Sequence, residues 1–108
     1  MFPRMACSTD FIDFVCQTLR PLGEVRPRKM MGDYIIYVNE KCVATACDNL
    51  LYVKILPSIK DLMASAEVGQ PYDGAKEHYI LDLADAAHAR AVVSALWEEL
   101  PFPGKGKK

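Results

Sequence analysis

The sequence predicts an α+β fold in which an antiparallel β-sheet, built as a meander, is flanked by an N-terminal and a C-terminal helix. Apolar residues recur at helical spacing near both ends of the chain, and β-branched and aromatic residues concentrate between them. A length of 108 residues fits one domain with one hydrophobic core. We therefore expect a single domain over residues 8–100, followed by a mobile basic tail at 101–108.

The first helix is expected to begin at Ser8 and Thr9, whose side-chain oxygens can cap it, with Asp10 favoured by the helix dipole. Pro21 and Gly23 are typical of its end. Its expected apolar face consists of Phe11, Phe14, Val15, Leu19 and Leu22.

The first part of the meander is expected at residues 25–38. Residues 25–31 can be extended, and Pro27, which has no N–H to donate, indicates an edge strand. Residues 34–38 are dense in β-branched and aromatic side chains and predict a strand. Alternation puts Tyr34, Ile36 and Val38 on one face of this strand, and Ile35 and Tyr37 on the other.

The meander continues through residues 39–55. A turn at 39–41 leads into a strand at 42–47, and Asp48 and Asn49 tolerate the positive φ angles of a tight hairpin. A strand at 50–55 follows.

The last part of the chain predicts two more helices and a strand. Pro57 and Ser58 favour a helix start, and the helix would end at Gly69, before a loop at 70–76 and a strand at 78–83. Asp82 or Asp85 would cap the final helix, and Pro101 would end it. The expected apolar face of the helix after Pro57 is Ile59, Leu62, Met63 and Ala66; that of the final helix is Ala89, Val92, Val93, Leu96, Trp97 and Leu100.

The charge balance argues against a dedicated nucleic-acid binder, because 13 basic and 14 acidic residues give a net charge of −1. Two basic groups could still contact phosphate. They also fit a charged edge strand that resists aggregation and a solubilising tail. The two groups are Arg26, Arg28 and Lys29 near the front, and Lys105, Lys107 and Lys108 at the end.

The cysteines and histidines do not have the spacing of known metal-binding motifs. No Cys-x-x-Cys pair occurs, and Cys42 and Cys47, five apart in one strand, are expected on opposite faces. The two histidines, His78 and His88, have no matched partner ligands. We expect no metal, no cofactor and no membrane span, and reduced thiols in a cytoplasmic protein.

Catalytic motifs are absent from the sequence: it has no Gly-x-Ser-x-Gly, no phosphate-binding loop and no dinucleotide fingerprint. Asp33 and Tyr34, beside Gly32, could act as an acid–base pair, but turn chemistry is the better explanation for Gly32 and Asp33. We therefore expect a protein that is not an enzyme.

The final helix offers a candidate surface for a protein partner or a homodimer. Trp97 could be an exposed anchor, and a position at the edge of the core is the alternative. The residues of this expected surface are Val93, Leu96, Trp97 and Leu100.

The run from Arg28 to Tyr37, with Met30, Gly32, Tyr34 and Tyr37, resembles the signature of the TfoX N-terminal domain family, which is named for a bacterial competence regulator. Residues 51–54 and the loop around Pro71 are also similar to that family. Met31, Asp33 and Ile35 depart from it, since they replace an aromatic residue and two glycines. The resemblance covers about residues 11–100 and implies a secretion-chaperone-like α+β fold and a link to competence regulation.

Taken together, these features favour a non-enzymatic regulatory module that acts through protein contacts on the final helix and the exposed face of the meander. The alternative is weak, sequence-independent DNA binding through the two basic groups. A third hypothesis is a small molecule bound near Tyr34, Tyr37 and Tyr52.

Overall fold

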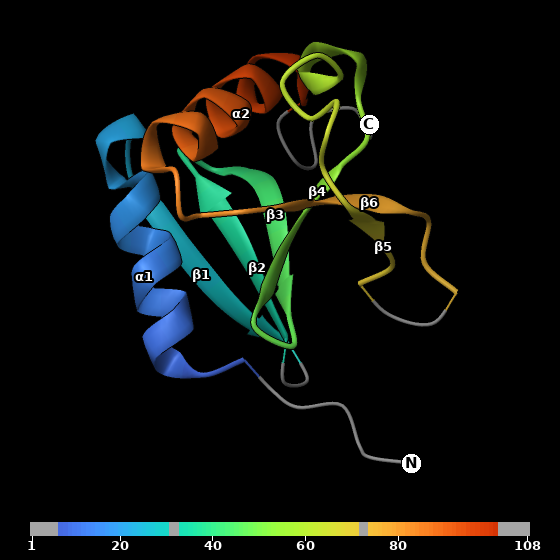
Figure 1. Cartoon of the computed structure of the whole chain (residues 1–108). Coiled ribbons are helices and arrows are strands. Elements are labelled where there is room, and N and C mark those ends of the chain that lie inside the picture. The colour runs from blue at the N-terminus through green and yellow to red at the C-terminus, as the bar shows by residue number, and fades with distance from the viewer. Residues whose placement is uncertain (1–6, 31–32, 72–73, 102–108) are drawn as a thin grey trace, which may run out of the picture.

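The computed structural model describes residues 7–30, 33–71 and 74–101, which form an antiparallel six-stranded sheet with the order β1-β2-β3-β4-β6-β5. Both helices pack on one side of this sheet (Figure 1). The expected α+β class is therefore confirmed. The elements are α1 (Thr9–Leu19), the 3₁₀ turn η1 (Arg20–Leu22), β1 (Val25–Met30), β2 (Asp33–Val38), β3 (Lys41–Cys47), β4 (Leu50–Lys54), η2 (Pro57–Ile59), β5 (Val68–Gly69), β6 (His78–Leu81) and α2 (Ala86–Glu99).

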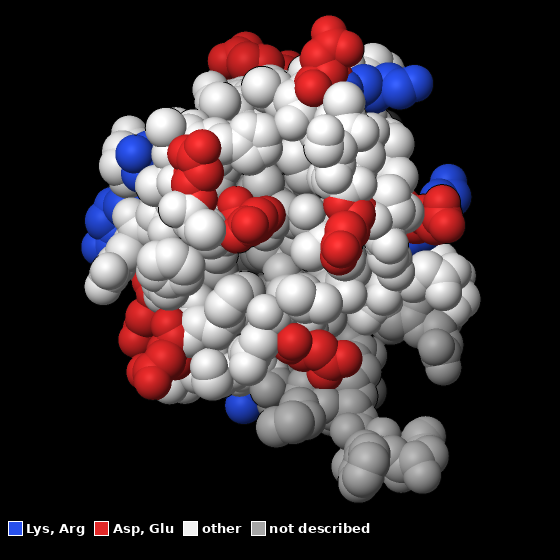
Figure 2. Space-filling view, viewed as in Figure 1, with Lys and Arg blue, Asp and Glu red and all other residues white. Residues whose placement is uncertain are grey.

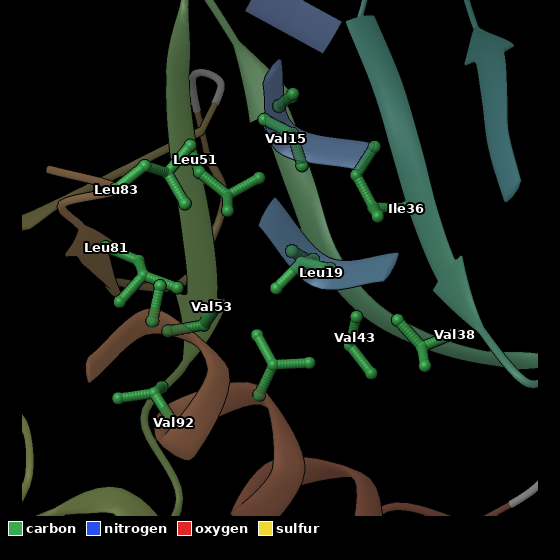
Figure 3. Close-up of a cluster of buried hydrophobic side chains, with 14 of the residues drawn as sticks. Val15, Leu19, Ile36, Val38, Val43, Leu51, Val53, Leu81, Leu83 and Val92 are labelled. Carbon is green, nitrogen blue, oxygen red and sulfur yellow. The ribbon is translucent and has the colours of Figure 1, made fainter. Parts of the chain in front are cut away.

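The hydrophobic core fills the space between the helices and one face of the sheet (Figure 3). Each central strand contributes alternate residues, since successive side chains point to opposite faces. The core side chains that are at most 1% exposed include Val15 and Leu19 of α1, Ile36 of β2, Ala46 of β3, Leu51 and Val53 of β4, and Val92, Val93 and Leu96 of α2.

Helix α1 begins as the sequence predicts, because Ser8 Oγ accepts a hydrogen bond from the N–H of Phe11 at 3.1 Å. The prediction that Phe14 belongs to the apolar face was wrong, because its side chain is 48% exposed. Ile12 and Cys16 are buried instead, and with Val15 and Leu19 they complete a stripe at helical spacing.

Tight turns join the strands of the meander. Asp48 and Asn49 have φ angles of 53° and 59°, which confirms the expected hairpin between β3 and β4. Asn39 and Glu40, with φ angles of 46° and 75°, form the turn between β2 and β3. Lys41 was expected in this turn but is the first residue of β3, and it is only 6% exposed.

A β-bulge changes which face of the sheet the side chains at the start of β3 point to. Its pairing with β2 shifts register between Ile36 and Tyr37, and the extra residue reverses the alternation. Cys42 pairs with Tyr37, and Cys47 pairs with Leu50, so both cysteines lie on the face away from the helices. The expectation that they lie on opposite faces was therefore wrong.

The segment after β4 does not form the predicted α-helix. It contains η2 followed by turns, with Lys60 donating to Pro57 and Ala66 donating to Met63 in i→i+3 hydrogen bonds. Of the four residues predicted for its apolar face, Ile59 and Met63 are buried in the core and hold this segment there. Gly69 lies in β5, a strand that the sequence did not predict.

Helix α2 begins at the second of its two expected caps. Asp85 Oδ1 accepts from the N–H of His88 at 3.1 Å, whereas Asp82 Oδ1 accepts from the N–H of Ala84 at 2.9 Å, before the helix. The helix ends at Leu100, whose ψ of 144° is extended, directly before Pro101.

Candidate functional site

The expected partner surface on α2 faces the interior. Val93 and Leu96 are fully buried, and Trp97 and Leu100 are partly buried against the core. The indole N–H of Trp97 donates to the backbone oxygen of Val38 at 2.7 Å. These residues hold α2 on the sheet, so Val93 and Leu96 are not accessible to a partner, and Trp97 and Leu100 are accessible only in part.

The basic cluster on β1 is divided between the two faces of the sheet. Arg26 pairs with Tyr37, and Arg28 pairs with Ile35. Lys29 pairs with Tyr34, on the face that carries the core residues Ile36 and Val38. Because paired residues share a face, Arg26 and Arg28 point away from the helices, and Lys29 points to the helix side.

The outward face of the sheet is open over β1, β2 and the start of β3. Further along the sheet, Tyr52 and Cys47 are buried on the same face, and a Cβ atom at Gly69 would lie 3.4 Å from the Tyr52 ring. The backbone at Gly69, in the edge strand β5, therefore approaches the Tyr52 ring. We call the uncovered part over β1, β2 and the start of β3, together with the exposed Lys54 at the end of β4, the open face; its residues are Arg26, Arg28, Met30, Asp33, Ile35, Tyr37, Cys42 and Lys54.

The open face joins positive charge to apolar and aromatic surface. The guanidinium carbon of Arg26 lies 4.7 Å from the centre of the Tyr37 ring, a cation–π geometry that fixes both side chains. Met30 is 44% exposed at the edge. Arginine, tyrosine and methionine are enriched in protein interfaces.

Cys42 is the exposed thiol among the described cysteines. Partial burial raises the pKa of Cys42, while the nearby Lys54 ammonium opposes that rise. The thiol is therefore mostly protonated at neutral pH, unlike a catalytic thiolate.

The residues of the family signature do not all lie on the same face of the sheet. Tyr34 packs against the core on the helix side, Tyr37 and Met30 lie on the open face, and Gly32 is outside the described residues. Since Tyr34 and Tyr37 lie on opposite faces, they do not line one binding site as the third hypothesis required.

The remaining predictions concern the C-terminal lysines, metal binding and a membrane span. Lys105, Lys107 and Lys108 lie outside the described residues. Within the described chain, no group of three or more histidine, cysteine or acidic residues could hold a metal ion. No helix in that part has the length and apolar character that crossing a bilayer requires.

Sequence reasoning proposed Arg26 and Arg28 as contact residues and placed Ile35 on the same face as Tyr37, which the strand pairing confirms. It did not place Asp33, Cys42 and Lys54 on this face. The signal for Ile35 is the alternation along β2, which puts it in phase with Tyr37. The position of Cys42 depends on the bulge, which no local pattern in the sequence indicates.

Comparison with known proteins identifies a family match across most of the chain. The model of the TfoX N-terminal domain matches residues 17–98. An uncharacterised 12.7 kDa protein of the trpE 5′ region in Spirochaeta aurantia is 35% identical over 78 residues, which cover 72% of this chain and 68% of that protein. No solved structure matches the chain.

Proposed function

Because the chain belongs to the TfoX N-terminal domain family, we propose that it is a non-enzymatic, competence-regulator-like module that acts by binding another protein. The observation that carries this proposal is the open face. It combines Arg26 stacked on Tyr37 with Arg28 and the exposed Met30.

The charge on the open face favours an acidic partner. Its three basic side chains, Arg26, Arg28 and Lys54, outnumber the single carboxylate, Asp33. A partner surface with carboxylates around an apolar centre would pair with the arginines and cover Ile35 and Met30. Charge complementarity of this kind steers association and excludes unsuitable partners.

The same charge disfavours a homodimer through this face. A two-fold axis would bring the same patch of both copies together, so the excess positive charge of one open face would meet that of the other. Like charges in one interface oppose association. We therefore propose a different protein as the partner.

DNA binding is the alternative function. Arg26 and Arg28 could neutralise phosphates while Tyr37 stacks on a base. Lys29 points to the other side of the sheet, however, and the whole chain is slightly acidic. Arg26 and Arg28 alone would give weak binding that salt abolishes.

The test compares a charge reversal on the open face with a matched reversal elsewhere. The purified chain captures its partner from cells that express it, and the isolated partner is then titrated by calorimetry. The Arg26→Glu/Arg28→Glu variant should bind at least about tenfold more weakly, as expected when interface charges are reversed. The control, Arg20→Glu/Lys60→Glu, changes exposed residues on η1 and beside η2 and should bind like the wild type.

Equal affinity of the two variants for the captured protein would overturn the proposal. In parallel, each variant is titrated into labelled duplex DNA over a salt series. Salt-sensitive binding that only the open-face variant loses, without any captured protein that depends on this face, would establish the DNA alternative instead.

A further inference from the structure

A pocket of about 730 Å³ opens on the helix side of the sheet, away from the open face. It lies between the start of α1, the β3–β4 hairpin, the turns at residues 61–67 and the residues that follow β6. Its volume is within the range of pockets that bind small molecules, roughly 300–1,000 Å³.

Most of the residues that line the pocket are apolar. Leu62 remains 40% exposed at its margin, so the fold leaves apolar surface accessible to a ligand there. Burying such surface would favour an apolar body. The apolar lining residues are Phe11, Leu50, Leu51, Leu62, Met63, Ala64, Ala66, Ile80, Leu81, Leu83 and Ala84.

The charged groups of the lining all have one sign. Asp61, Glu67 and Asp82 line the pocket, whereas no lysine or arginine of the described chain does. Figure 2 shows acidic side chains spread over this face around a central hollow, with basic side chains at the margins. Carboxylates at an apolar pocket attract a cation and repel an anion.

We propose that this pocket binds a small organic cation, with an apolar body against the leucines and an ammonium or guanidinium group at the carboxylates. The carboxylates of Asp61 and Glu67 would accept charge-assisted hydrogen bonds from that group. Failure of this proposal would leave the proposed function unaffected, because the pocket and the open face use different residues.

The test uses three probes of similar shape and different charge, titrated into the ¹⁵N-labelled chain: 2-phenylethylammonium, 2-phenylethanol and 3-phenylpropionate. The cation should shift the amide signals of the pocket residues, Leu62, Ala66 and Leu83 among them, in a saturable way. The alcohol should bind about tenfold more weakly, since loss of one charge-assisted hydrogen bond is worth roughly that factor. Equal affinity for all three probes, or shifts outside the pocket, would overturn the proposal.

Variants locate the binding. Asp61→Asn/Glu67→Gln should weaken binding of the cation about tenfold, whereas Asp10→Asn/Asp13→Asn, on the exposed side of α1, should not. Ala64→Phe places a large side chain at an exposed lining position and should block the pocket without disturbing the core. Unchanged binding by this variant, with its helix content intact by circular dichroism, would also overturn the proposal.

Discussion

The ammonium of Lys41 lies 2.6 Å from the backbone oxygen of Trp97 and 3.8 Å from the centre of the Trp97 ring. One lysine therefore binds the last turn of α2 through a hydrogen bond and a cation–π contact. A positive charge at this end of a helix also complements the helix dipole. The contact joins the start of β3 to the end of α2, 56 residues apart in sequence.

Removal of the Lys41 side chain should destabilise the domain. We expect Lys41→Ala to lower the free energy of unfolding by about 2–4 kcal/mol, because a charge-assisted hydrogen bond and a cation–π contact are lost together. Urea unfolding measures the loss. The control Lys60→Ala, at an exposed position, should change stability by less than about 0.5 kcal/mol, and a similar small effect for Lys41→Ala would contradict this role.

The indole nitrogen of Trp97 makes a separate contribution. Trp97→Phe keeps an aromatic ring but removes the N–H that bonds to the Val38 oxygen. The unpaired oxygen and the smaller ring should cost about 1–3 kcal/mol in stability. Thermal unfolding should show a lower midpoint with the helix signal unchanged at 20 °C. An unchanged midpoint would mean that this hydrogen bond does not hold α2 in place.

Gly23 should be intolerant of substitution. It has φ of 150°, and a Cβ atom there would overlap the carboxamide of Asn39. That carboxamide accepts from the N–H of Glu24 and donates to the oxygen of Leu22, so it has little freedom to move. We expect Gly23→Ala to cost more than about 2 kcal/mol, which combines backbone strain with the lost hydrogen bonds.

Gly74 provides the matched control, because its φ is also positive, at 85°, but no atom lies near its Cβ position. Gly74→Ala should cost only about 1 kcal/mol, from backbone strain alone. If both variants unfold at the same denaturant concentration, the contact with Asn39 is not the reason for glycine at position 23.

The Cys16 thiol should make stability depend on pH in the alkaline range. Burial raises the pKa of Cys16 above its ordinary value, and Arg20 opposes that rise in part. The folded state therefore keeps its proton at a pH where the unfolded chain has lost it. The free energy of unfolding should fall as the pH rises above the ordinary thiol pKa, about 8.5.

Cys16→Ala isolates this effect, since every other titrating group is retained. Denaturant unfolding of both proteins between pH 7.5 and 10 should show a smaller fall for the variant. Parallel curves for the two proteins would contradict a raised pKa of Cys16.

Local sequence signals predicted those parts of the fold whose physical cause is local. Ser8 and Asp85 cap helices through bonds to residues three positions away. Asp48 and Asn49 adopt the positive φ angles that suit these residues. The alternation in β2 follows from its own pattern of side chains.

The parts that were missed depend on distant contacts. Nothing near Lys41 in the sequence shows that Trp97 will bind it, and the bulge in β3 shows only in its pairing with β2. The turns after Pro57 replaced a helix because short helices are marginal without packing, and the core holds only Ile59 and Met63 of that segment tightly. The same limit explains why α2 was mistaken for a partner surface: its stripe is wide because it covers the sheet.

The amide NMR footprint of the captured partner on the ¹⁵N-labelled chain tests the central claim most directly. If the open face is the binding surface, the largest shifts should fall on Arg26, Arg28, Ile35 and Tyr37, with the amides of α2 unchanged. Shifts concentrated on α2 or around the helix-side pocket, with the β1 and β2 signals unmoved, would contradict the account.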